Sequence, residues 1–349
     1  MNLNDKQKEV VTTTKNKVLV QAAAASGKTA CLIERLNWLL QMGQDPKKIV
    51  AITFTNNAAA EIKERLVVDA DGMFVGTVHS FCNYLLRAGG VATDEILNED
   101  RFDDLFPLIK ENPQCIREID HLIVDEAQDS TELQFAFFEL LSPKNFMYFF
   151  DLRQSILGFA GAYPDYIILL KQAPGITLYE LNQNYRNGNA ILNQARKVIN
   201  SLGREFQDHS IPMRHMQGKF VYGELSYEGI VKTLKDEKYG DWFILCRSNK
   251  EVETMCFVLK KNGIPCDTFK QGDLNNQQIH ERMKADTVKV LTVHSAKGLE
   301  ANKVLVYDPR LYNDDERRLY YVAATRARDV LLWIKPPKKS SKKKTTNWE

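Results

Sequence analysis

The stretch VLVQAAAASGKTA at residues 18–30 decides the fold class of this chain. Its aliphatic first half predicts a buried strand, and the residues that follow predict the start of a helix. Between them, AAAASGKT at 22–29 fits a phosphate-binding loop, with alanine at the position of the first glycine. Backbone N–H groups at such a helix start bind phosphate, and the helix dipole adds to the attraction. A Ser-Gly turn that only caps a helix is the simpler alternative, but the flanking strand and helix both favour the phosphate site.

Two groups of polar side chains predict a nucleotide site around this loop. Lys28 is expected to reach the β- and γ-phosphates, and the hydroxyl of Thr29 is expected to ligate Mg²⁺. In LIVDEAQD at 122–129, Asp125 and Glu126 end an apolar strand at the carboxyl edge of the sheet, where ligands bind in open α/β folds. Asp125 is expected to hold Mg²⁺, and Glu126 to orient or deprotonate the attacking water. Such a pair alone is more often a solvated strand end, but its position 97 residues (125 − 28) after Lys28 favours one shared site.

Apolar strands alternate with amphipathic helices through most of the chain, which predicts an α/β fold. The alternation occurs twice, so we expect two domains, each with a parallel sheet flanked by helices on both faces. The predicted strands are VLVQ at 18–21, IVAIT at 49–53, LIVD at 122–125, FMYFF at 146–150, TLYE at 177–180, KFVYGEL at 219–225, WFILC at 242–246, VKVLTV at 288–293, KVLVY at 303–307 and VLLWI at 330–334. Because Pro174 and Gly175 break the pattern, the predicted boundaries are 1–176 for the first domain, 177–335 for the second and 336–349 for a basic, disordered tail.

Composition narrows the class of protein further. The 349 residues carry a net charge of +2, but KPPKKSSKKK at 335–344 holds six lysines, so the remainder is near −4 (+2 − 6). Any contact with nucleic acid must therefore come from local surfaces or from that tail. The six cysteines are scattered without a CxxC pair, which predicts reduced thiols and no zinc site or disulfide framework. No apolar run approaches the roughly 20 residues that span a bilayer. We therefore expect no membrane association and a cytoplasmic location.

Nine motifs in order give the chain a resemblance to the superfamily 1A helicases, the UvrD/Rep/PcrA/AddA-like group. They are Gln7 in LNDKQKEVV, the phosphate loop, AITFTNNAAAEIKERL at 51–66, GTVHSFC at 76–82, LIVDEAQD at 122–129, FFDLRQSILGFAGA at 149–162, LNQNYRNGNAIL at 181–192, LTVHSAKGLEANKV at 291–304 and ERRLYYVAATRAR at 316–328. The resemblance implies two RecA-like P-loop domains with ATP bound between them.

The resemblance also assigns roles to residues around the nucleotide. The loop residues Ala25, Ser26, Gly27, Lys28 and Thr29 are expected to hold the phosphates. Gln7 would read adenine, Tyr185 would stack on it, and Glu300 would contact the nucleotide. Gln154 would sense the γ-phosphate, and Arg186 and Arg326 would approach it from the second domain as arginine fingers.

A second set of residues is expected to line a groove for nucleic acid across both domains. Hydroxyl and imidazole groups suit phosphate contacts, and aromatic rings suit base stacking, although core packing is the simpler role for a lone phenylalanine. The set comprises Thr53, Phe54, Thr55, Thr77, His79, Phe159, Thr292 and His294.

The implied function is an ATP-dependent translocase or helicase on single-stranded DNA that moves 3′ to 5′, with ATP and Mg²⁺ as cofactors. A nuclease or a replication or repair protein is the expected partner. Two alternatives stay open: an ATP-gated nucleic-acid-binding subunit with weak or no hydrolysis, and an RNA-directed motor, since stacking and backbone contacts discriminate the 2′-OH poorly.

Three departures from the family pattern bear on this function. Ala25 replaces a glycine, which costs roughly 1 kcal/mol or more if the position needs positive φ. Ala160 stands where arginine is common, and Leu157 where tyrosine is common. Only 46 positions (125 − 79) separate His79 from Asp125, and 108 (294 − 186) separate Arg186 from His294. Both large inserted subdomains of full-size relatives are therefore expected to be absent or reduced to a short loop.

Overall fold

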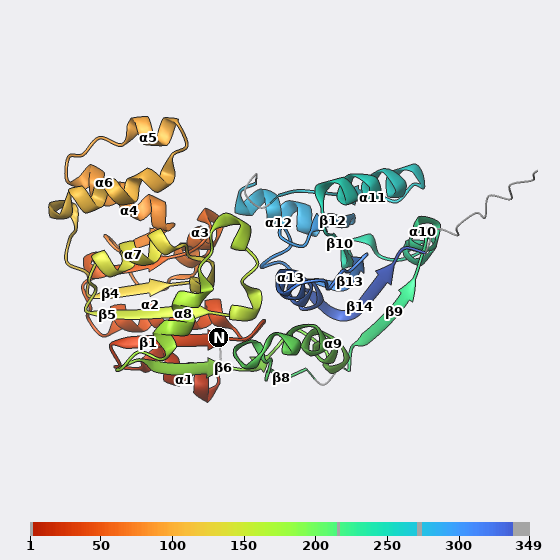
Figure 1. Cartoon of the computed structure of the whole chain (residues 1–349), viewed down its shortest axis with the longest axis horizontal. Helices are drawn as coiled ribbons and strands as arrows, with labels where there is room; N and C mark the ends of the chain where they lie inside the picture. The colour runs from red at the N-terminus through yellow and green to blue at the C-terminus, as the bar shows by residue number, and fades with distance from the viewer. Residues whose placement is uncertain (1–2, 215–216, 271–273, 338–349) are drawn as a thin grey trace, which may run out of the picture.

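The computed structural model describes residues 3–214, 217–270 and 274–337, which form two lobes side by side (Figure 1). Each lobe is built on a six-stranded sheet, and the pairings within both sheets are parallel. Parallel sheets need crossover connections, and helices supply them here. The predicted fold class, α/β with two parallel sheets flanked by helices, is confirmed.

The first sheet has the strand order β3-β2-β4-β5-β1-β6. Its strands are β1 (Lys17–Ala22), β2 (Ile49–Ile52), β3 (Phe74–Gly76), β4 (His121–Val124), β5 (Asn145–Phe150) and β6 (Thr177–Leu181). Because side chains alternate along a strand, Leu19 enters one core while Val18 and Val20 enter the other. The core around Val18 and Val20 is closed by α1 (Asp5–Thr12), α2 (Lys28–Gln41) and α3 (Asn56–Arg65). The core around Leu19 is closed by α4 (Val78–Ala88), α6 (Leu105–Glu111), α7 (Glu132–Leu140) and α8 (Pro164–Lys171).

The second sheet has the strand order β11-β12-β10-β13-β14-β9. Its strands are β9 (Lys219–Glu224), β10 (Trp242–Cys246), β11 (Cys266–Asp267), β12 (Val288–Thr292), β13 (Ala301–Tyr307) and β14 (Ala327–Lys335). Phe243 and Leu245 pack in the core that includes α9 (Asn189–Ile199) and α13 (Asp314–Ala324). Trp242 and Ile244 pack on the other face, with α10 (Tyr227–Leu234) and α11 (Asn249–Lys261). Helix α12 (Asn276–Lys284) and the short pair β7 (Gln183–Asn184) and β8 (Ile211–Pro212) complete this part of the chain.

The predicted division after residue 176 is contradicted by the pairing of β6. This strand, expected to open the second domain, runs parallel to β1 with Val18 opposite Thr177. The break at Pro174–Gly175 is a turn that returns the chain to the same sheet, and Gly175 supplies the positive φ of 80°. We propose that the first domain ends after β6. Residues 338–349 of the predicted tail lie outside the described residues.

A small helical unit occupies the interval between His79 and Asp125, where the sequence predicted at most a short loop. It contains α5 (Asp94–Asn98), a 3₁₀ turn at Phe102–Asp104 and α6, and it projects from the first lobe above α4 (Figure 1). In the second interval, from Arg186 to His294, the structure describes βα units of the sheet together with β8 and short connections, so that expectation agrees with the fold. Within the described ranges, every helix is too short or too polar to cross a bilayer.

Candidate nucleotide and nucleic-acid sites

The phosphate loop lies between β1 and α2, as the sequence predicts. Ala25 has φ 57° and Gly27 has φ 82°, so alanine occupies a left-handed position that favours glycine. A Cβ on residue 27 would lie 2.7 Å from Nε2 of Gln7, a group that donates to the Ser26 carbonyl at 2.9 Å. Gln7 thus closes the loop from helix α1, and glycine is required opposite it.

Lys28 lies among acidic side chains at the end of β4. Its Nζ is 3.1 Å from Oδ1 of Asp125 and also pairs with Glu126. Burial lowers the pKa of Lys28, but the two carboxylates outweigh it and raise the pKa above the usual range. Burial opposes ionisation of Glu126 too, yet the charges of Lys28 and Lys297 lower its pKa to about 2. Glu126 is therefore ionised, as a general base requires, and its φ of 51° places it in a strained backbone region typical of functional sites.

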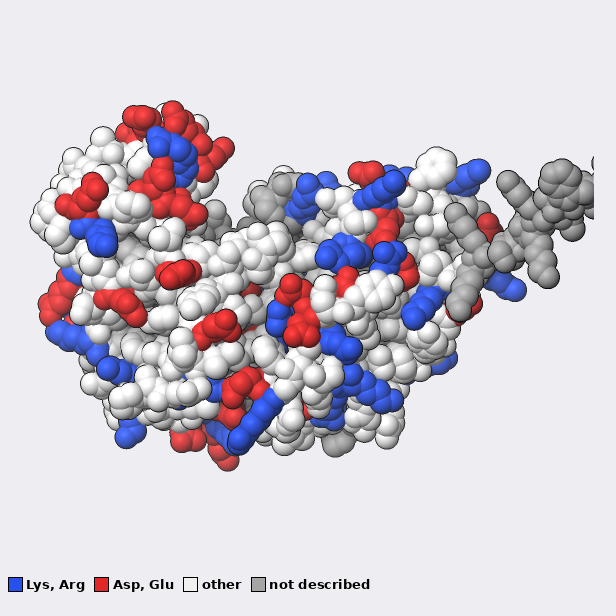
Figure 2. All heavy atoms as spheres, in the orientation of Figure 1, with Lys and Arg blue, Asp and Glu red and all other residues white. Residues whose placement is uncertain are grey.

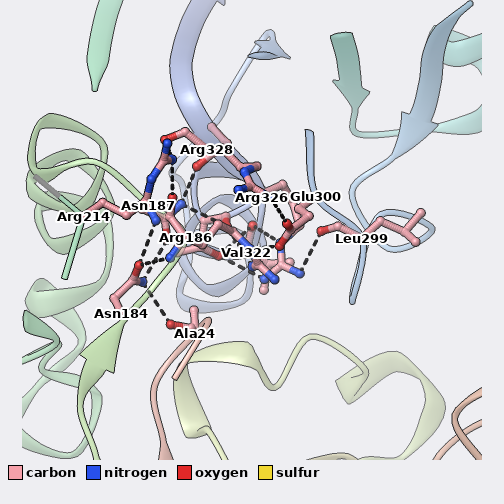
Figure 3. Close-up of polar contacts among 12 residues, drawn as sticks. Ala24, Asn184, Arg186, Asn187, Arg214, Leu299, Glu300, Val322, Arg326 and Arg328 are labelled. Carbon is pink, nitrogen blue, oxygen red and sulfur yellow. Dashed lines mark hydrogen bonds and ion pairs between the residues drawn. The ribbon is translucent and has the colours of Figure 1, made fainter. Parts of the chain in front are cut away.

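The second lobe supplies the opposite wall of the site (Figure 3). Arg326 is buried, and its Nη2 donates to Oε1 of Gln154 in the first lobe at 3.2 Å. Burial and the neighbouring charge of Arg186 lower the pKa of Arg326 to about 9. Glu300 pairs with Arg186 and accepts from Nη1 of Arg328 at 2.7 Å. Two mutually repelling guanidinium groups are suited to an anion placed between the lobes.

A loop that follows β6 holds this wall against the phosphate loop (Figure 3). Nδ2 of Asn184 donates to the Ala24 carbonyl at 2.9 Å, and Oδ1 of Asn184 accepts from the Arg186 backbone at 3.0 Å. The Tyr185 N–H donates to the Ala25 carbonyl at 3.1 Å. Tyr185 and Arg186, the predicted stacking residue and arginine finger, are therefore fixed to the predicted phosphate loop.

These side chains surround a cleft of about 800 Å³ between the lobes. Of the residues assigned to the nucleotide, all but Asp125 line it. They are Gln7, Ala25, Ser26, Gly27, Lys28, Thr29, Glu126, Gln154, Tyr185, Arg186, Glu300 and Arg326. Asp125 instead lines the neighbouring cavity behind Glu126. Burial raises the pKa of Asp125, although Lys28 opposes the shift, so a cation beside this carboxylate would stabilise its ionised form.

The residues present fit ATP and Mg²⁺. The cleft has the volume of a small-molecule site, and it joins backbone N–H groups, a buried lysine and two arginines. Asp125 and Thr29 offer the hard oxygen donors that Mg²⁺ prefers, and this ion commonly uses one or two protein ligands beside phosphate and water. When bound, Mg²⁺ would neutralise phosphate charge.

Several residues of the site were not predicted. Leu3, Arg65 and Arg328 also line the cleft. Lys297 crosses from the second lobe to pair with the buried Asp129, and its Nζ donates to the Gln154 carbonyl at 3.0 Å. Arg328 and Lys297 lie within two of the motifs quoted above, and this position could have identified them as site residues. Arg65 ends helix α3, and only the packing of that helix brings it to the cleft.

Six of the eight residues assigned to nucleic acid line two cavities outside the nucleotide cleft. Four of them, Thr53, Phe54, Thr77 and His79, line a cavity of about 280 Å³ in the first lobe. Phe159 and His294 line one of about 330 Å³ at the junction of the lobes, together with Arg247, which was not predicted. Thr55 and Thr292 line neither cavity.

The exposed fractions of the two phenylalanines assigned to nucleic acid exclude core packing as their role. Phe159 is 79% exposed and Phe54 is 49% exposed, so packing in the core does not explain either side chain. The ring of Phe159 meets His294 edge-on, with centroids 5.2 Å apart. These exposed rings are available for stacking.

The threonine hydroxyls already have local roles. Thr55 and Thr77 accept from backbone N–H groups as the N-caps of α3 and α4. Thr292 accepts from the Ser295 backbone at 3.1 Å. A structural role of these three residues is therefore visible beside the predicted contact with phosphate.

Together, the paired parallel sheets, the phosphate loop and the arginines facing it define a two-lobed P-loop protein. Residues 3–114 and 108–174 match the UvrD/REP helicase N-terminal domain, and residues 270–336 match the UvrD-like helicase C-terminal domain. The chain belongs to the UvrD/REP helicase family.

Individual relatives agree with this assignment. DNA helicase II of Salmonella typhimurium is 30% identical over 95% of this chain and 60% of its own length. A probable DNA helicase of Mycoplasma pneumoniae is 23% identical, covering 95% of this chain and 83% of that protein. ATP-dependent DNA helicase PcrA of Staphylococcus aureus is 26% identical over 76% of this chain and 50% of its own length. The chain thus spans little more than half the length of two of these relatives.

The alignment with DNA helicase II also shows that length is missing inside the aligned part of this chain. It runs over 435 positions, 86 more (435 − 349) than this chain contains. At least that many positions of the relative therefore lie opposite gaps inside the aligned part of this chain. This agrees with the expectation that the inserted subdomains of full-size relatives are absent or reduced in this chain.

Proposed function

We propose that this protein is an ATP-driven motor that moves along single-stranded DNA in the 3′-to-5′ direction. The observation that carries the proposal is the cleft in which Lys28 and Glu126 of one lobe face Arg186 and Arg326 of the other. ATP hydrolysis in such a cleft removes the anion that the arginines share, so it favours separation of the lobes. The names of the relatives support DNA as the track, and the direction follows the family resemblance.

Exposed aromatic residues of the first lobe, one of them in contact with the second lobe, support DNA as the track. Phe54 lies in the first lobe, and Phe159 meets His294 of the second. If the two lobes alternate their grip on a strand, each opening and closing of the cleft becomes a step. Stacking reads no base identity, so we propose a motor without sequence preference.

The experiment that tests this proposal is ATP turnover titrated with single-stranded DNA and RNA oligonucleotides. We expect stimulation by DNA in the wild type, and loss of the stimulated rate in Lys28→Ala and in the isosteric Glu126→Gln. Removal of a general base lowers a rate by about 10²–10⁴. Full activity in either variant would show that the site is misassigned. Stronger stimulation by RNA would make the chain an RNA-directed motor, and ATP binding without turnover would make it an ATP-gated clamp.

Unwinding is a separate property, and we propose that the protein alone translocates well and unwinds duplex poorly. The helical unit at 94–111 is small, and the relatives carry additional segments. A nuclease or a replication or repair protein would then supply the missing function as a partner. Displacement of streptavidin from the 5′ end of an oligonucleotide, but not from its 3′ end, is expected for a 3′-to-5′ motor. Robust strand displacement by the monomer would contradict the weak unwinding.

A further inference from the structure

The small helical unit above α4 carries an acidic surface beside the predicted path of nucleic acid. Figure 2 shows acidic side chains gathered over this projection at the upper left of the molecule. Its exposed carboxylates belong to Asp94, Glu95, Glu99, Asp100, Asp103, Asp104 and Glu111. Arg101 pairs with Glu95, Glu99 and Asp104, and Arg87 pairs with Asp94. These four carboxylates therefore have neighbouring positive charge, while Asp100 and Asp103 have no arginine or lysine partner among the described residues.

Asp103 differs from Asp100 because it reaches the predicted nucleic-acid surface. Its Oδ1 lies 3.0 Å from Nε2 of His79, and both residues line the 280 Å³ cavity with Phe54 and Thr77. The His79 ring is held by the aromatic side chains of the same unit, with centroids 5.2 Å from Phe106 and 5.9 Å from Phe102. Nε2 of His79 is thus already paired with a carboxylate.

The rest of this cavity offers a phosphate no better cation. Its lining includes no lysine or arginine, but it does include the acids Asp125, Glu126 and Asp129. Those acids are paired with Lys28, which lines the nucleotide cleft, and with Lys297 of the second lobe. His79 is therefore the one lining side chain that can carry positive charge toward a phosphate at the rim.

We propose that Asp103 occupies the phosphate position at His79 and must be displaced when a strand binds. The inference rests on the proposed function, because it assumes that His79 contacts the strand. Asp103 is held by an exposed contact with His79, so it leaves readily, while the buried Phe106 keeps the imidazole in place. The helical unit then acts as an electrostatic gate that weakens binding to strands and favours their release.

The test is equilibrium binding of a fluorescent oligothymidylate to the full chain at fixed low salt. We expect Asp103→Asn to bind two- to fivefold more tightly than the wild type, roughly the range that exposed ion pairs span. Asp100→Asn is the matched control, since it removes the same charge from the same unit away from His79. Its positive φ of 55° is one that asparagine accepts. We expect the change in affinity caused by Asp100→Asn to be less than half of the change caused by Asp103→Asn.

A double variant separates displacement from general repulsion. If Asp103 acts through His79, then adding Asp103→Asn to His79→Ala should not tighten binding further. Equal affinities of Asp103→Asn and Asp100→Asn would overturn the inference, and so would full additivity in the double variant. Absence of binding by every variant, wild type included, would overturn the proposed function and the inference with it.

Discussion

Ala25 shows how one residue of the phosphate loop carries strain at the centre of the site. Its φ of 57° lies in the left-handed region, and its carbonyl accepts the Tyr185 N–H at 3.1 Å. The loop therefore keeps the shape that phosphate requires although it lacks the usual glycine. The adjacent contacts with Asn184 and Tyr185 hold the strained residue in place.

Ala25→Gly should stabilise the protein. Relief of left-handed strain is worth about 1 kcal/mol, partly offset by the greater freedom of glycine in the unfolded chain. We expect a higher midpoint in thermal unfolding and unchanged or tighter ATP binding. Ala23→Gly is the control, because Ala23 has no positive φ and the same substitution should destabilise there. A lower midpoint for Ala25→Gly would contradict the strain.

Phe159 is the aromatic residue whose exposure most favours a contact with bases. Phe159→Ala should weaken binding of single-stranded DNA by about 1–3 kcal/mol, the range for loss of one stacked base. Phe257→Ala on α11 is the control, since Phe257 is 67% exposed and lines none of the cavities described above. Fluorescence anisotropy measures both. If the two variants bind DNA equally well, Phe159 does not stack on the strand.

At the scale of elements, local sequence predicted the strands and the site far better than the boundaries. All ten quoted runs form strands, because aliphatic and β-branched runs of this length can be buried on both sheet faces. The three-residue β3 and the two-residue β11 were missed, since such short runs carry little periodic signal. The boundary error at β6 arose because a Pro-Gly pair marks a turn without saying whether the next strand rejoins the same sheet.

The helical unit at 94–111 was missed for a different reason. The number of residues between His79 and Asp125 measures length, and length does not show whether a segment folds back as helices. Asp103 was consequently not predicted at the nucleic-acid surface, because its 3.0 Å contact with His79 joins residues that are 24 positions apart in the sequence. Contacts of this kind depend on how elements pack, and the sequence pattern does not contain them.

Strand β4 also carries a pH-sensitive element at its start. Burial, together with the charge of Arg35, lowers the pKa of His121 to about 4, although Asp120 opposes the shift. Between pH 6.5 and 4 the unfolded chain binds a proton at this site that the folded protein does not, so stability falls as the pH falls. We expect His121→Gln to lose less thermal stability than the wild type between pH 7 and pH 4.5. His280→Gln, at an exposed histidine of α12, should lose as much stability as the wild type. An equal loss of thermal stability at low pH in all three proteins would refute the assignment of this effect to His121.

For the whole molecule, the central feature is that neither lobe holds a complete site. The first lobe provides the phosphate loop and Glu126, while Arg186, Glu300 and Arg326 close the cleft from the other side. Arg326 and Lys297 both reach Gln154, at 3.2 Å to its side chain and 3.0 Å to its carbonyl. Gln154 therefore links the two lobes at the nucleotide cleft, and we propose that it relays a change at the nucleotide between them. The sequence order of the motifs predicted this convergence, and the structure brings all but Asp125 to the cleft wall.

The most direct test of a shared site is to remove a group that only the second lobe supplies and to measure turnover of ATP held by the first. Arg326→Ala should lower the DNA-stimulated rate by about 10³ or more, as expected for an arginine finger, while ATP binding changes only a few-fold. Arg326→Lys, which keeps the charge but not the fork, should recover little, and Arg310→Ala at an exposed arginine should behave as wild type. Thermal unfolding confirms that each variant is folded. A folded Arg326→Ala protein that hydrolyses ATP at the wild-type rate would contradict the account.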